Sequence, residues 1–71
     1  MYEIREVDGT RDICVGAWSG DTPIEALNRM ARGVGFADFA TARSGPWQHL
    51  QFLAYPLLPD NRRATDQPDL Y

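Results

Sequence analysis

The sequence of 71 residues has few of the side chains that form disulfides or structural metal sites, since it contains one cysteine and one histidine. It also contains no lysine. A single cysteine cannot form a disulfide within the chain. Cys14 and His49 together also fall short of the four ligands that a structural zinc ion needs. We therefore predict a fold that rests on side-chain packing alone, with no metal and no cofactor.

Long hydrophobic runs are absent as well. The longest nearly apolar stretch, residues 50–58, includes Gln51 and Pro56 and is far shorter than the roughly 20 apolar residues that cross a bilayer. The first residues form neither a basic segment nor an apolar one, so nothing in them marks the chain for secretion. The expectation is a protein without membrane spans, located in the cytoplasm.

Positive charge is scarce, because seven arginines stand against ten carboxylates and the formal net charge is −3. Affinity for nucleic acid comes mainly from neutralised phosphates, so this balance predicts no direct nucleic-acid binding. Asp8 and Asp12 fall in an acid-rich stretch near the N-terminus. Both could steer a partner with a basic surface electrostatically, while ordinary turn chemistry is the alternative for Asp8.

Two strands are predicted near the N-terminus. Residues 2–7 alternate in polarity with the period of a half-buried strand, and residues 13–18 alternate in the same way. The intervening Asp8-Gly9-Thr10-Arg11 is typical of a tight hairpin turn. Simple alternation places Ile13 and Trp18 on opposite faces of the second strand.

A helix is predicted next, because Thr22, Pro23 and Glu25 fit the N-cap, the first and the third helical positions. Gly33 or Gly35 ends this helix. Apolar residues recur within it at intervals of three and four, which gives one apolar stripe. The stripe consists of Ile24, Leu27, Met30, Ala31 and Val34.

Residues 36–43 favour a second short helical segment, and residues 47–55 favour a third strand that places Trp47 opposite Phe52. From residue 59 onward no apolar periodicity remains, so we predict a single domain over 1–58 and a flexible C-terminal tail over 59–71. The predicted fold class is α+β. It is a small ββαβ domain with a three-stranded antiparallel sheet in the order 2-1-3, one main helix on one face and the short second helical segment.

Catalytic chemistry finds little support in the sequence. His49 is the one side chain able to act as a base on Cys14 near neutral pH, and lone residues of these types are more often structural. No carboxylate sits in an apolar sequence setting that would raise its pKa for acid-base work. The sequence therefore predicts a protein that is not an enzyme.

Large apolar side chains are predicted on both faces of the sheet, although one helix can cover only one face. Trp18, Trp47 and Tyr55 fall on surfaces that this helix leaves open, and exposed aromatic residues are typical of interfaces. Together with Asp8 and Asp12, they are the predicted partner-binding residues. Three coverings of the second face stay open: the chain itself, a second copy in a homodimer, or a different protein.

The run WSGDTPIEAL at residues 18–27, continued by ARGVGFADFA at residues 31–40, resembles small proteins of phages and mobile elements. Among small acidic proteins of this kind the anti-CRISPR inhibitors are the best-understood class, and the resemblance to them is one of type, without a shared motif. It implies a non-enzymatic inhibitor that occupies the surface of a larger nucleic-acid-handling host complex. The alternative is a small homo-oligomeric regulatory or antitoxin-like protein.

Overall fold

A hairpin formed by β1 (Tyr2–Asp8) and β2 (Arg11–Trp18) is the first unit of the fold. In the computed structural model, which describes residues 1–71, Gly9 has a φ of 61° and Thr10 a negative φ. These are the backbone signs of a type II′ turn, which takes glycine at its first central position. The predicted hairpin is confirmed.

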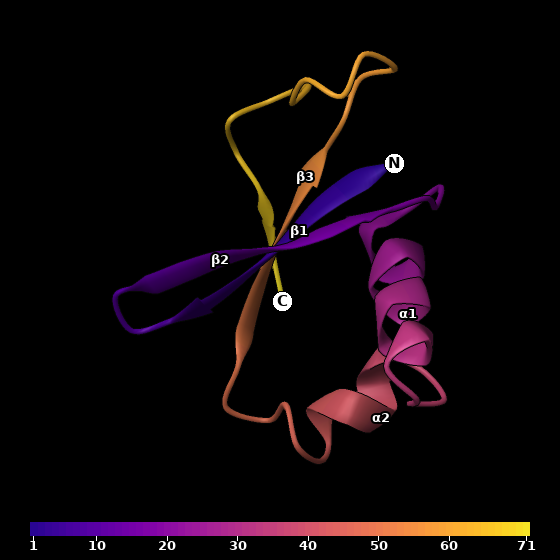
Figure 1. The fold of residues 1–71 in the computed structure, drawn as a ribbon, viewed down its shortest axis with the longest axis vertical. Coiled ribbons are helices and arrows are strands. Elements are labelled where there is room, and N and C mark those ends of the chain that lie inside the picture. The colour runs from indigo at the N-terminus through magenta and orange to yellow at the C-terminus, as the bar shows by residue number, and fades with distance from the viewer.

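Two further strands complete an antiparallel sheet in the order β2-β1-β3-β4 (Figure 1). β3 (Gln51–Pro56) pairs with β1, and β4 (Asp69–Leu70) pairs with β3. The predicted order 2-1-3 and the antiparallel pairing are confirmed. The predicted count of three strands is wrong, because the fourth strand comes from the segment whose composition suggested a tail.

Two helices, α1 (Pro23–Gly33) and α2 (Phe39–Arg43), follow the hairpin and confirm the α+β class. They pack on the side of the sheet that carries Ile4, Phe52 and Ala54, which we call the helix face; the opposite side is the open face. Neither helix is long and apolar enough to cross a membrane. The buried core consists of Ile4, Ala26, Leu27, Met30, Ala31, Phe39, Ala42, Phe52 and Ala54.

The start of α1 follows the sequence signal. The side-chain oxygen of Thr22 accepts a hydrogen bond from the N–H of Glu25 at 3.3 Å, and the Glu25 carboxylate accepts one from the N–H of Asp21 at 2.7 Å. The first bond satisfies one of the free N–H groups of the helix end, and the second ties the residue before the N-cap to the first turn. The predicted N-cap, with Pro23 at the first helical position, is confirmed.

A β-bulge interrupts β2. The pairing along β1 shifts between residues 4 and 5, because Val15 has no partner there, and one extra residue reverses the alternation of side chains. Gly16, at a φ of 147°, lies beneath the indole of Trp18, which is 3.0 Å from the place a Cβ would occupy. Trp18 therefore packs on the helix face, as Ile13 does. The prediction of opposite faces for these two residues is wrong, because alternation does not reveal the bulge.

The third strand starts later than predicted, because a turn precedes it. The Arg43 guanidinium donates hydrogen bonds to the carbonyl oxygens of Trp47, at 3.2 Å, and of Leu50. The turn directs the Trp47 ring onto the helix face, where its centroid lies 5.0 Å from that of Phe36 and 5.4 Å from that of Phe52. The prediction that Trp47 lies in a strand, opposite Phe52, is wrong.

The C-terminal segment folds back along β3. Phe52 and Tyr71 exchange two backbone hydrogen bonds of 2.7 and 2.9 Å, and the Tyr71 ring centroid lies 6.5 Å from that of Phe39. Burial raises the pKa of the Tyr71 phenol, and the carboxylate of Asp69 adds to the effect. The last residues of the predicted tail thus contact β3 and the core, which the loss of apolar periodicity after residue 58 does not reveal.

The packing of Tyr71 leads to a first prediction. Tyr71→Ala should lower the thermal midpoint by about 5 °C or more, which corresponds to roughly 1 kcal/mol in a domain of this size, because the ring leaves the core. Leu70→Ala is the matched control, since Leu70 is 61% exposed and should change the midpoint little. Circular dichroism during heating measures the midpoints. Equal midpoints for the two variants and the parent would support the flexible tail instead.

Candidate functional site

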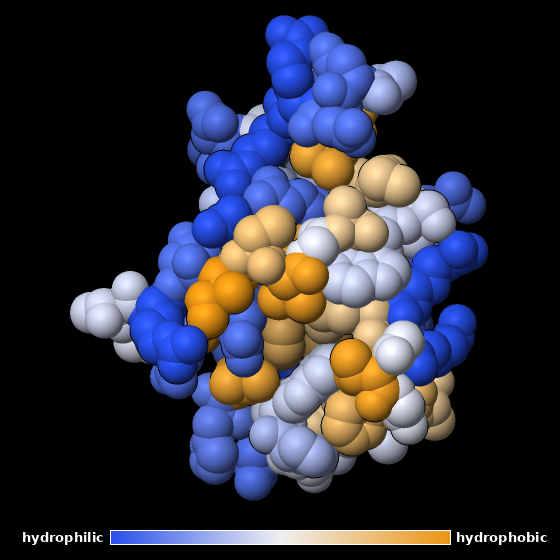
Figure 2. Space-filling view, viewed as in Figure 1, coloured by the Kyte–Doolittle hydropathy of each residue, from blue (hydrophilic) through white to orange (hydrophobic).

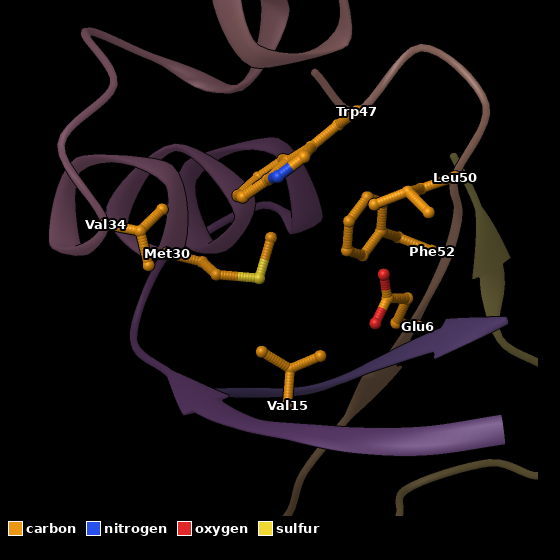
Figure 3. A pocket seen from close by; sticks show the side chains of 7 residues that line it. All are labelled: Glu6, Val15, Met30, Val34, Trp47, Leu50 and Phe52. Atoms are coloured by element: carbon orange, nitrogen blue, oxygen red, sulfur yellow. The ribbon is translucent and has the colours of Figure 1, made fainter.

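A largely apolar pocket of about 200 Å³ opens on the helix face beside the C-terminal end of α1 (Figure 3). The β1–β2 hairpin, the end of α1 and the turn before β3 enclose it. Six of the seven residues around it are apolar, which suits it to an apolar group. The lining consists of Glu6, Val15, Met30, Val34, Trp47, Leu50 and Phe52.

The hairpin supplies the floor of the pocket. Glu6 of β1 is paired with Ile13 of β2, and Val15, two residues after Ile13, lies on the same face as these two residues. Figure 3 shows the Val15 side chain pointing into the pocket and the Glu6 carboxylate turned toward Phe52. Val15 thus keeps the face that alternation from Ile13 gives it, and the bulge brings the following Gly16 and Trp18 to this face as well.

The wall opposite the hairpin depends on how α1 ends. The N–H groups of Gly35 and Phe36 donate to the carbonyl oxygens of Arg32, at 3.1 Å, and of Ala31, at 3.0 Å. This pattern is a Schellman motif, with Gly35 at a φ of 102° in the position that favours glycine. The motif stops the helix at the point where Val34 can face the pocket instead of continuing along a helical turn.

Glu6 is the one charged residue in the lining. It is half-buried, and its side chain takes part in no ion pair or hydrogen bond within the chain. Glu3, three residues away on the open face, pairs with both Arg5 and Arg63. The pocket therefore offers an unpaired carboxylate among apolar side chains, a combination that suits an apolar group next to a cation.

The rim of the pocket is exposed and apolar. Ile13 and Val15 are each 41% exposed, and Val34 is 62% exposed. Figure 2 shows apolar atoms gathered over the middle of the molecule, between the hairpin and the helices. Single exposed apolar residues are ordinary, whereas a cluster around a hollow marks an interaction surface.

The open face is covered differently, by a chain of alternating charges. Arg5 donates to Asp12 at 2.6 Å and to Glu3 at 2.9 Å, and Arg63 donates to Glu3 at 2.8 Å. The Arg63 guanidinium also lies 3.7 Å from the centroid of the Tyr55 ring, in a cation–π contact. The C-terminal segment thereby covers part of the second face, one of the three coverings that the sequence left open.

This network shifts the pKa of Glu3. The hydrogen bond from Arg63 lowers the pKa of the Glu3 carboxyl, burial opposes it, and the hydrogen bond from Arg5 lowers it further. A carboxyl whose pKa is lower in the folded state stabilises the fold above its unfolded pKa, about 4.5 for glutamate. That stabilisation is lost as the pH falls through the folded pKa.

The structure does not bring the five predicted partner-binding residues together. Asp8 is exposed beside the hairpin turn, and Asp12 is exposed but paired with Arg5. Trp18 and Trp47 are half-buried against the core on the helix face. Tyr55 lies under Arg63 on the open face. No one partner surface of the kind predicted contains all five.

Of the pocket residues, only Trp47 was among those predicted from the sequence to bind a partner, although a signal for a second one was present. Alternation from Tyr2 and Ile4 puts Glu6 on the core side of β1, where a carboxylate is unexpected. Alternation also places Val15 on the face of Ile13, whereas Val34 carries no comparable signal, since its position depends on the geometry of the helix end.

Cys14 and His49, the one pair that the sequence offered for covalent catalysis, do not lie together in a site. Cys14 is exposed on β2, whereas His49 is exposed in the turn before β3, and the two side chains form no hydrogen bond. The chain also holds no group of three or more side chains arranged to bind a metal ion. Comparison with known protein families, curated proteins and solved structures finds no match.

The shifted pKa of Glu3 leads to a second prediction. Glu3→Gln should destabilise the protein at pH 7, because it removes the charge that Arg5 and Arg63 share, and the difference from the parent should shrink as the pH is lowered below about 4.5. Urea unfolding at a series of pH values measures it. Glu6→Gln, on the same strand but without an ion pair, is the control and should change stability little. If the free energies of unfolding of Glu3→Gln and the parent differ by the same amount at every pH, the assigned role of the network is contradicted.

Proposed function

We propose that this chain is a non-enzymatic protein-binding module whose contact surface is the pocket together with its apolar rim. The observation that carries the proposal is the convergence of exposed apolar residues from two elements around an unpaired carboxylate. Ile13, Val15 and Val34 form the rim, and Glu6 lies within. Such a mixture of apolar and charged groups is found where one protein anchors a side chain of another.

The size of the pocket favours a protein partner over a small molecule. Its volume of about 200 Å³ is below the roughly 300–1,000 Å³ of pockets that enclose drug-sized ligands. It matches a single large side chain better. The adjoining strand β2 lies at the edge of the sheet, so a partner chain can add backbone hydrogen bonds to the side-chain anchor.

A narrower form of the proposal is an inhibitor of the anti-CRISPR type that occupies a nucleic-acid-handling host complex. The support for it is the net charge of −3 and the exposed Asp8, which lies at the hairpin turn without an ion pair. Such a charge steers association with a basic surface. Asp12 contributes less to steering, because Arg5 already neutralises it.

Selection from a random displayed peptide library tests the broader proposal without knowledge of the partner. Peptides enriched on the parent protein should share a large apolar residue next to arginine or lysine, and Val15→Asp should weaken their binding by about 2 kcal/mol or more, as loss of an interface anchor does. Leu70→Asp is the matched control, because Leu70 is also apolar and exposed but lies opposite Leu53 on the open face.

Melting curves first establish that both variants are folded. If no peptide is enriched, or if the enriched peptides bind Val15→Asp as well as they bind the parent, the pocket is not the contact surface and the proposal fails.

A further inference from the structure

The sheet has one long free edge, and it adjoins the pocket. One edge is the eight-residue β2, and the other is the two-residue β4. An edge strand presents unpaired N–H and C=O groups that accept another strand unless a proline, a charge or a bulge blocks them. The bulge of β2 lies at Val15, so residues 11–14 stay regular.

We propose that this edge binds a second copy of the chain, with the two β2 strands antiparallel about a twofold axis at Ile13. The inference rests on the proposed function, because it assigns the partner of the same surface. The pairing would join two four-stranded sheets into one, through an isologous interface in which each copy offers the same residues.

The register follows from the hairpin. Asp8 and Arg11 flank the two-residue turn and are paired, and pairs alternate along the ladder between hydrogen-bonded and non-hydrogen-bonded. The N–H and C=O groups of Asp12 and Cys14 therefore point away from β1. An axis at Ile13 matches Asp12 of each copy with Cys14 of the other, whereas an axis at Asp12 would oppose two like charges, which is destabilising.

Charge complementarity favours a second copy over an unrelated strand. Arg11 is exposed and forms no ion pair within the chain, and Glu6 is likewise unpaired. In this register Ile13 of the second copy lies between Ile13 and Glu6 of the second copy. Arg11 is therefore separated from that Glu6 by two strand spacings across the sheet and two residues along the strand. The Cα atoms are then about 12 Å apart, a span that an arginine and a glutamate bridge when they extend toward each other.

The same register covers the exposed apolar residues of the hairpin. Ile13 would lie against Ile13 of the second copy on the helix face, in a non-hydrogen-bonded pair, where side chains approach most closely. Val15 would lie beside Arg11 of the second copy, whose aliphatic stem can cover apolar surface. Each copy thus supplies both the apolar contact and the cation that the other copy's pocket lacks.

Sedimentation velocity over a series of protein concentrations tests the dimer. The parent should show a reversible monomer–dimer equilibrium, and Arg11→Glu or Glu6→Arg should each raise its dissociation constant by about tenfold or more, because each places like charges together. The double variant that carries both changes should recover most of the lost dimer affinity, because it restores opposite charges at the two positions. Arg62→Glu is the control, because it makes the same change in charge as Arg11→Glu on an exposed residue of the C-terminal segment.

The native cysteine tests the register. In Asp12→Cys, mild oxidation should yield a disulfide between the new thiol and Cys14 of the second copy, whereas Arg62→Cys should not cross-link in this way. Peptide mapping identifies the bond. This readout does not require that the charge-reversed variants fold, and melting curves check Asp12→Cys.

A parent that is monomeric at every concentration overturns the dimer, as does a dimer that survives in a folded Ile13→Asp variant. A monomer whose pocket still selects peptides would overturn the dimer alone and leave the protein-binding proposal standing. A dimer with the predicted cross-link but no selected peptides would support the second copy as the partner.

Discussion

The packing of α1 against Ile4 and Ala54 is the contact on which the other parts of the structure depend. These residues are fully buried, and they lie on the two central strands of the sheet. α1 has 11 residues and is therefore about 16 Å long, whereas the eight residues of β2 span about 27 Å. The helix cannot cover the whole hairpin, and the turn half of β1 and β2 extends past the core. The pocket and its exposed rim lie where this cover stops.

The two faces of the sheet are covered by different physical means. On the helix face, aromatic rings from α2 and the following turn pack on Phe52, with Phe39 at 5.5 Å and Trp47 at 5.4 Å between centroids. On the open face, the C-terminal segment places Arg63 on Tyr55 and Glu3. Ion pairs that are partly shielded from water contribute more than isolated exposed pairs, although each remains modest. The C-terminal segment thus covers part of the open face of the sheet, where there is no second layer of helices.

Local signals in the sequence predicted the parts of the fold that depend on neighbours in the chain. The turn at Gly9 and the N-cap at Thr22 are of this kind, because residues within three or four positions determine them. The bulge at Val15, the turn that holds Trp47 and the pairing of β4 were missed. The pairing of β4 depends on contacts between residues distant in the sequence, such as the hydrogen bonds between Phe52 and Tyr71. The turn depends on hydrogen bonds from the Arg43 side chain to the backbone. Polarity patterns record neither kind of contact, nor the extra residue of a bulge.

The candidate site was less predictable than the fold for the same reason. Aromatic residues suggested an interface, yet Trp18 and Trp47 serve the core, while the exposed surface consists of smaller β-branched residues at the hairpin and the helix end. Trp47 lines the pocket and was predicted to bind a partner, and Glu6 was within reach of the sequence through its place in the alternation of β1. The residues form one site only because the end of α1 and the turn before β3 bring Val34 and Trp47 to the hairpin.

The central claim is that the helical layer ends short of the hairpin and leaves the outer edge of β2 open for binding. Amide hydrogen exchange, followed by mass spectrometry on dilute and on concentrated protein, tests this claim most directly. Peptides covering residues 51–56 should exchange slowly at both concentrations, since β3 lies between two strands. Peptides covering residues 11–16 should exchange fast in dilute solution and become protected on concentration. Protection of residues 11–16 in dilute solution equal to that of β3, or no change on concentration, would contradict the account.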